Sequence, residues 1–77
     1  MGTFLRIGPY RIEIRTREHG VPHFHVVGPD GEASVALKDF RILAFTGVNE
    51  RDIRRICKVL EDHQETMMEV WHENQKD

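Results

Sequence analysis

Apolar and polar residues alternate along the first part of the chain, which indicates β-strands. The segment Tyr10–Arg15 alternates without interruption, as a strand does when one of its faces is in contact with water. Thr3–Ile7 is a β-prone run just before it. The two residues between these runs, Gly8 and Pro9, favour a tight turn, because glycine can adopt positive φ and proline fixes φ. The pattern therefore predicts a first β-hairpin.

A second hairpin is predicted in the middle of the chain. His23–Val27 and Glu32–Leu37 are short β-prone segments, and the turn sequence Gly28-Pro29-Asp30-Gly31 separates them. Successive side chains of a strand point to opposite faces. We therefore expect Phe24 and Val26 on the core face of the first segment and its two histidines on the other face.

The last third of the chain has the three- and four-residue spacing of an amphipathic helix. A further short strand is predicted at Phe40–Phe45, and Asn49 after it is a good N-cap residue. From there we predict one uninterrupted helix that continues to about Glu73, and roughly 25 residues of helix span about 37 Å. The apolar stripe of this helix consists of Ile53, Ile56, Leu60, His63, Met67, Val70 and Trp71.

The length and composition of the chain fit one domain, residues 1–77. A sequence of 77 residues with 39% hydrophobic residues can build a single core. We predict an α+β fold: an antiparallel sheet of two β-hairpins, with four to five strands, packed against one long C-terminal helix. Cys57 is the single cysteine, so packing must hold the fold, and we expect a cytoplasmic location. The sequence shows no apolar run of the roughly 20 residues that a membrane span requires.

Charge is unevenly distributed along the chain. The net charge is −2, which is less basic than is usual for a nucleic-acid-binding protein, so RNA binding has weak support. In the predicted helix, basic residues fill the N-terminal half and acidic residues the C-terminal half, which opposes the helix macrodipole beyond the first turn. A neighbour could balance these charges, either the Arg-bearing face of the sheet or a second copy of the helix running antiparallel in a homodimer. The alternative is a solvated helix whose charges contribute little.

Histidines in the predicted third strand suggest a metal site. His23 and His25 are two residues apart, so a strand presents both imidazoles on one face, close enough to bind one ion. Glu18 or His19, in the preceding connection, could supply a third ligand for Zn²⁺ or another divalent metal. Histidines and glutamates of the helix could complete or support the site, namely His63, His72, Glu69 and Glu73.

Two other interpretations of the same cluster remain open. Histidines can transfer protons in RNA cleavage, with His23 and His25 as the catalytic pair and Arg15 or Arg17 holding phosphate. In the other interpretation, the histidines and Glu18 form hydrogen bonds with one another or with loop carbonyl groups, without a ligand.

The chain also resembles a family of small bacterial proteins known as domain of unknown function 4160. The resemblance extends over nearly the whole length, and its specific part is the central motif Glu18-His19-Gly20-Val21-Pro22-His23-Phe24-His25-Val26. It implies that Glu18, His19, His23 and His25 are signature residues. It also implies a small partner protein, in an arrangement similar to toxin-antitoxin pairs.

Three hypotheses about function follow from these observations. The first is a bacterial accessory domain of the toxin-antitoxin type that binds a partner protein and a divalent metal. The second is a histidine-dependent ribonuclease toxin. The third is a structural dimerisation module built on the long helix.

Overall fold

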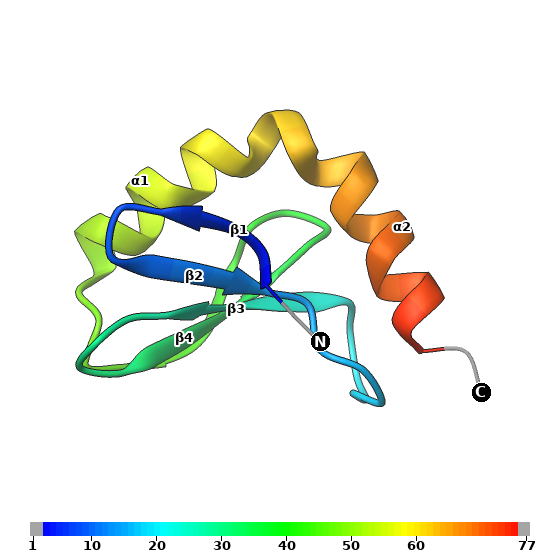
Figure 1. Ribbon diagram of the computed structural model, residues 1–77, viewed down its shortest axis with the longest axis horizontal. Coiled ribbons are helices and arrows are strands. Elements are labelled where there is room, and N and C mark those ends of the chain that lie inside the picture. Colours follow the sequence, from blue (N-terminus) through cyan, green and yellow to red (C-terminus); the bar gives the residue numbers. More distant parts are fainter. Residues whose placement is uncertain (1–2, 76–77) are drawn as a thin grey trace.

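The computed structural model describes residues 3–75, which form one antiparallel sheet followed by a bent helical segment (Figure 1). Each strand pairs with the next along the chain, so the sheet order is β1-β2-β3-β4-β5. The strands are β1 (Thr3–Ile7), β2 (Tyr10–Glu13), β3 (His23–Val27), β4 (Glu32–Ala36) and β5 (Ile42–Thr46). The helical part consists of α1 (Glu50–Leu60), a 3-10 turn η1 (Glu61–His63) and α2 (Gln64–Asn74). The predicted α+β architecture is thereby confirmed.

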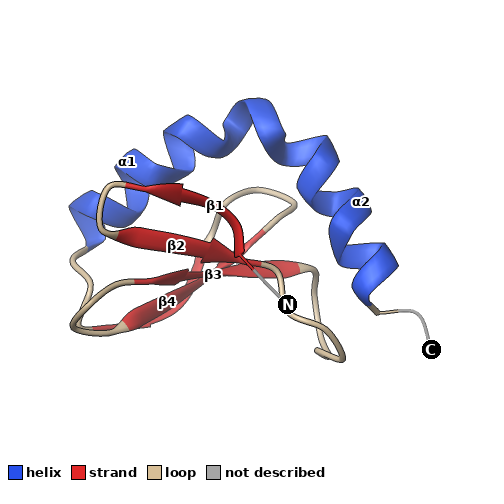
Figure 2. Ribbon diagram, viewed as in Figure 1, coloured by secondary structure: helices blue, strands red, loops and turns tan. Residues whose placement is uncertain are grey.

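The core lies between the sheet and the helices, which arch over the strands (Figure 2). Phe24 in β3 sits opposite Val35 in β4, and Val26 sits opposite Ile12 in β2. All four side chains are fully buried. Burying apolar side chains of this size contributes about 1.5–3 kcal/mol each. The predicted division of β3 into a core face with Phe24 and Val26 and a histidine face is therefore correct.

The fifth strand begins two residues later than the sequence pattern suggests. Phe40 has φ 60°, in the left-handed region, and its backbone N–H donates to the carbonyl of Ala36 at 2.9 Å. This turn reverses the chain, so the strand can begin only at Ile42. The Phe40 ring packs against Phe24 with centroids 6.0 Å apart, so the turn residue contributes to the core although it lies outside the strand.

The helix is bent at η1, whereas the sequence predicts an uninterrupted helix. A straight helix of this length would extend past the sheet, since the longest dimension of the molecule is 33 Å. At the bend, the Gln64 side chain donates hydrogen bonds to the carbonyl groups of Leu37 and Lys38, at 2.7 and 2.9 Å. His63 is exposed, although the sequence places it on the apolar stripe. The bend directs α2 down the end of the sheet, where Trp71 is buried.

Among residues 3–75, no helix is long and apolar enough to cross a membrane.

Candidate functional site

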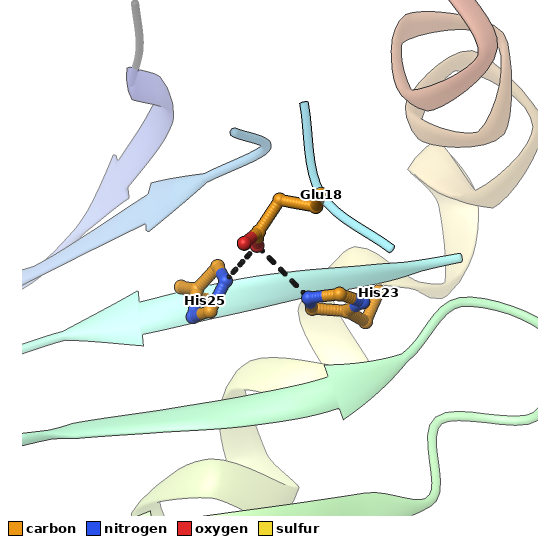
Figure 3. A group of neighbouring side chains, drawn as sticks. All are labelled: Glu18, His23 and His25. Atoms are coloured by element: carbon orange, nitrogen blue, oxygen red, sulfur yellow. Dashed lines mark hydrogen bonds and ion pairs between the residues drawn. The ribbon is translucent and has the colours of Figure 1, made fainter. Parts of the chain in front are cut away.

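Three side chains from the central motif converge beside β3 (Figure 3). His23 and His25 emerge from the same face of the strand, and their ring centroids are 5.1 Å apart. Glu18 approaches them from the loop that connects β2 and β3. One oxygen and two nitrogen atoms of these residues lie within 4.8 Å of one another. The arrangement predicted for this pair of histidines is therefore present in the structure.

A single carboxylate oxygen lies at the centre of the group. Oε1 of Glu18 is 2.9 Å from Nε2 of His23 and 2.6 Å from Nε2 of His25. The histidine side chains are only 14% and 11% exposed, and that of Glu18 is 28% exposed. The group is thus largely shielded from bulk water, and Glu18 is its most exposed member.

The second ring nitrogen of each histidine faces an acceptor. Nδ1 of His23 lies 2.8 Å from the carbonyl oxygen of Val21. A carbonyl can only accept, so this contact assigns a proton to Nδ1, while Nε2 faces the Glu18 carboxylate. Nδ1 of His25 is buried without a hydrogen-bond partner among the described residues, and the nearest acid is Glu32, whose Oε2 is 3.5 Å away.

The histidines hold Glu18 in its charged form. The hydrogen bond from His25 is the largest cause of a lowered pKa for the Glu18 carboxyl group. Burial works in the opposite direction, and the hydrogen bond from His23 again lowers the pKa. Glu18 is therefore a carboxylate at neutral pH, the form that can donate electron pairs to a cation.

An arginine bridges two acids next to the group. Arg15 contacts Glu13 at 3.0 Å and Glu32 at 3.2 Å. Burial alone would raise the pKa of Glu13, but the hydrogen bonds from Arg11 and Arg15 outweigh it, so the pKa is lowered. Arg15 thereby holds the Glu32 carboxylate close to His25. Its charge is shared between these two acids, which makes it a poor phosphate ligand.

The end of α2 fixes the loop that carries Glu18. The Trp71 ring packs against the His23 ring, with centroids 4.9 Å apart. The side chain of Gln75 accepts a hydrogen bond from the backbone N–H of Glu18 at 2.7 Å and donates to the carbonyl of Arg15 at 2.9 Å. The sequence predicted Trp71 as a core residue, and its burial confirms this; its contact with His23 was not predicted.

The other candidate residues lie outside the group of three. His19 is exposed, and the metal-ligand group found among residues 3–75 does not include it. Arg17 is exposed and has φ 58°. His63 and His72 are exposed on the helical segment, and the His63 ring contacts Phe4 rather than the histidines of β3.

These features define a small α+β domain with a five-stranded meander, a bent C-terminal helix and a partly buried Glu-His-His group. The family model of the domain of unknown function DUF4160 matches residues 10–72, and the chain belongs to this family. The matched region contains the whole central motif from Glu18 to Val26. No match was found among curated proteins or among solved structures.

Proposed function

We propose that this protein binds one divalent transition-metal ion, of the zinc class, through Glu18, His23 and His25. The observation that carries the proposal is the convergence of one carboxylate oxygen and two imidazole Nε2 atoms within 4.8 Å. Zinc ligands lie about 2.0–2.2 Å from the ion, which places neighbouring ligand atoms roughly 3–4 Å apart. The distances from Oε1 of Glu18 to the two Nε2 atoms, 2.9 and 2.6 Å, are shorter than this, so Glu18 must move outward to admit the ion.

The surroundings of the histidines support metal binding. Histidine ligands usually donate their other ring N–H to a carbonyl or a carboxylate, which fixes the tautomer and the ring orientation. His23 has this arrangement through the Val21 carbonyl. With Nε2 of His25 bound to the metal, its Nδ1 carries the proton and faces the Glu32 carboxylate. This chain thus supplies, for each histidine ligand, an oxygen that faces its second ring nitrogen: the Val21 carbonyl for His23 and the Glu32 carboxylate for His25.

A purely structural hydrogen-bonded cluster explains these contacts less well. Such a cluster leaves Nδ1 of His25 buried without a hydrogen bond, and an unsatisfied buried polar group costs about 1–3 kcal/mol. In addition, the Nε2 atoms of both histidines contact the same oxygen of Glu18, although a carboxylate has two oxygen atoms that can accept a hydrogen bond. A cation bound to both Nε2 atoms accounts for their convergence on one oxygen, and it places the proton of His25 on Nδ1, which then faces the Glu32 carboxylate.

Metal binding is also better supported than the ribonuclease hypothesis. RNA cleavage requires a cation next to the histidines that is free to hold phosphate. Arg15 is engaged by Glu13 and Glu32. The charged groups that lie against the histidine rings are two acids, Glu18 and Glu32. A negative environment repels phosphate and attracts a metal cation.

Three protein ligands leave the fourth position of a tetrahedral zinc ion for water or for a ligand from outside the chain. Glu18 is the most exposed of the three side chains, so such a ligand would approach beside it. A partner protein of the kind that the family resemblance implies could supply it.

Zinc titration of the metal-free protein tests the proposal. We expect one ion per chain by isothermal titration calorimetry at pH 7, together with a change in the fluorescence of Trp71, whose ring packs on His23. His25→Ala should weaken binding by more than about 100-fold, which exceeds the usual effect of losing an outer partner. His72→Ala is the matched control, since His72 is exposed on α2, and it should bind as the wild type does.

Two outcomes would contradict the proposal: no binding at millimolar zinc, or equal binding by the His25→Ala variant. His19→Ala tests the fourth residue of the sequence motif separately. Because His19 is exposed and lies outside the group, this variant should retain the affinity of the wild type.

A further inference from the structure

The last turn of α2 is bound to the loop that carries Glu18 by hydrogen bonds from side chains to the backbone. Gln75, directly after α2, accepts from the N–H of Glu18 at 2.7 Å and donates to the carbonyl of Arg15 at 2.9 Å. Asn74, the last residue of α2, donates to the carbonyl of Ile14 at 2.8 Å. These three bonds join residues that are 57 to 60 positions apart. They hold the backbone from which the Glu18 side chain extends.

Helix α2 has fewer buried residues than α1. Two of its eleven residues are buried, Met67 and Trp71, whereas α1 has the same length and four buried residues. The Trp71 ring packs on the ring of His23, so the end of α2 also contacts a histidine of the candidate site. Elements with few buried apolar contacts open locally at a lower free energy than the rest of a fold. The end of α2 is therefore the part of the scaffold around the site that opens most easily.

We propose, on the basis of the metal site described above, that docking of the last turn of α2 controls the metal affinity, with Gln75 as the positioning residue. His23 and His25 lie on β3, so the sheet fixes their positions, whereas Glu18 lies in a loop. A binding group must be held within about 0.5 Å of its working position. When Gln75 releases the loop, Glu18 is no longer held beside the histidines, and the ion keeps two of its three protein ligands.

Gln75 holds Glu18 without blocking the ion. Its side chain bonds to the backbone N–H of Glu18 and not to the carboxylate, so the Glu18 side chain can still turn outward to admit the metal. Binding equilibria are reciprocal. If docking of α2 raises the metal affinity by some factor, the bound metal favours the docked state by the same factor. The ion therefore stabilises the docked position of the last turn of α2.

Zinc affinities of two glutamine variants, from isothermal titration calorimetry at pH 7, test this inference. Gln75→Ala should raise the Kd about 10- to 100-fold, the usual effect of losing an outer partner of a metal site. Gln64→Ala is the matched control, because Gln64 also bonds to backbone carbonyl groups, those of Leu37 and Lys38, but at the start of α2. It should leave the Kd within about twofold of the wild type. Circular dichroism checks that both variants remain folded.

Hydrogen exchange of the wild type is a second measurement and needs no substitution. The amides of residues 71–75 should exchange at least about tenfold more slowly at saturating zinc than in EDTA. Unchanged exchange there with zinc bound would overturn the inference and leave the metal site in place.

The calorimetric outcomes separate the two proposals. A wild type that does not bind zinc would contradict the metal site, and this inference with it. A wild type that binds zinc together with a folded Gln75→Ala variant of equal affinity would overturn this inference alone. Equal weakening by Gln64→Ala would assign the effect to α2 in general and would also overturn the role of Gln75.

Discussion

Replacing Glu18 with glutamine isolates the role of its charge in the metal-free protein. The carboxylate accepts hydrogen bonds from Nε2 of His23 and of His25, at 2.9 and 2.6 Å. Hydrogen bonds to charged groups contribute about 1.5–3 kcal/mol each, and a neutral acceptor keeps about half of that. The loss would be about 1.5–3 kcal/mol in a fully buried site. Because the side chain is 28% exposed, we expect about 1–2 kcal/mol.

The effect should depend on pH in a defined direction. The pKa of Glu18 is lower in the folded protein than in the unfolded chain, where it is about 4.3. The charge therefore stabilises the fold above the unfolded pKa, and this contribution is lost as the pH falls through the lower, folded pKa. The difference in free energy of unfolding between wild type and Glu18→Gln should be largest at pH 7 and should decrease below about pH 4.

Urea denaturation with EDTA, at pH 7 and at pH 3, measures this difference. Glu69→Gln is the control, since Glu69 is exposed on α2, and it should change stability by less than about 0.5 kcal/mol at either pH. A Glu18→Gln effect of the same size at both pH values would refute the reasoning, because it would show that the carboxylate charge is not what stabilises the loop.

Three further predictions concern the scaffold. Gly47→Ala should destabilise the fold by at least about 1–3 kcal/mol in urea denaturation, because φ is 74° and the new Cβ would overlap the carbonyl of Asp30; an effect near zero would contradict this. Met67→Ala should lower the free energy of unfolding by about 2–5 kcal/mol in the same assay, since Met67 is fully buried between sheet and helix. A loss below about 1 kcal/mol would contradict this, because it would show that neighbouring side chains move in and fill the cavity. Burial raises the pKa of the Cys57 thiol, so iodoacetamide at pH 8 should modify the folded protein at least tenfold more slowly than the urea-unfolded chain, and equal rates would contradict its burial.

The strands could be predicted from sequence because each signal was local. The alternation in Tyr10–Arg15 and the turn residues of Gly28–Gly31 act over neighbouring residues. In the structure, β2 lies in the alternating segment, and β3 and β4 lie on the two sides of the turn. The limits of β5 were less accurate, because the left-handed conformation of Phe40 is favoured by burial of its ring against Phe24. Burial of that kind depends on residues far apart in the sequence.

The bend in the helix explains a charge pattern that looked unfavourable for one straight helix. α1 ends with Lys58 in its last turn, and α2 begins with Glu65 in its first turn. Each half thus has a charge that suits its own dipole at this junction. The reversal of charge near residue 60 was visible in the sequence, so it was a usable signal for the break.

The site was predictable only in part. The spacing of His23 and His25 fixes the side of the strand on which their rings lie, which is a local property. The contacts of Gln75 with the loop and of Trp71 with His23 join residues about 50 positions apart or more. No periodicity in the sequence encodes such contacts, because they depend on the bend at η1 and on the path of the loop.

The most direct test of the metal site is a ¹⁵N NMR experiment on the histidine rings, recorded during titration with one equivalent of zinc. The Nε2 resonances of His23 and His25 should move to metal-bound positions, and their Nδ1 atoms should remain protonated, while the rings of His19, His63 and His72 keep their shifts. Unchanged Nε2 resonances of His23 and His25 at one equivalent of zinc would contradict metal binding by this group.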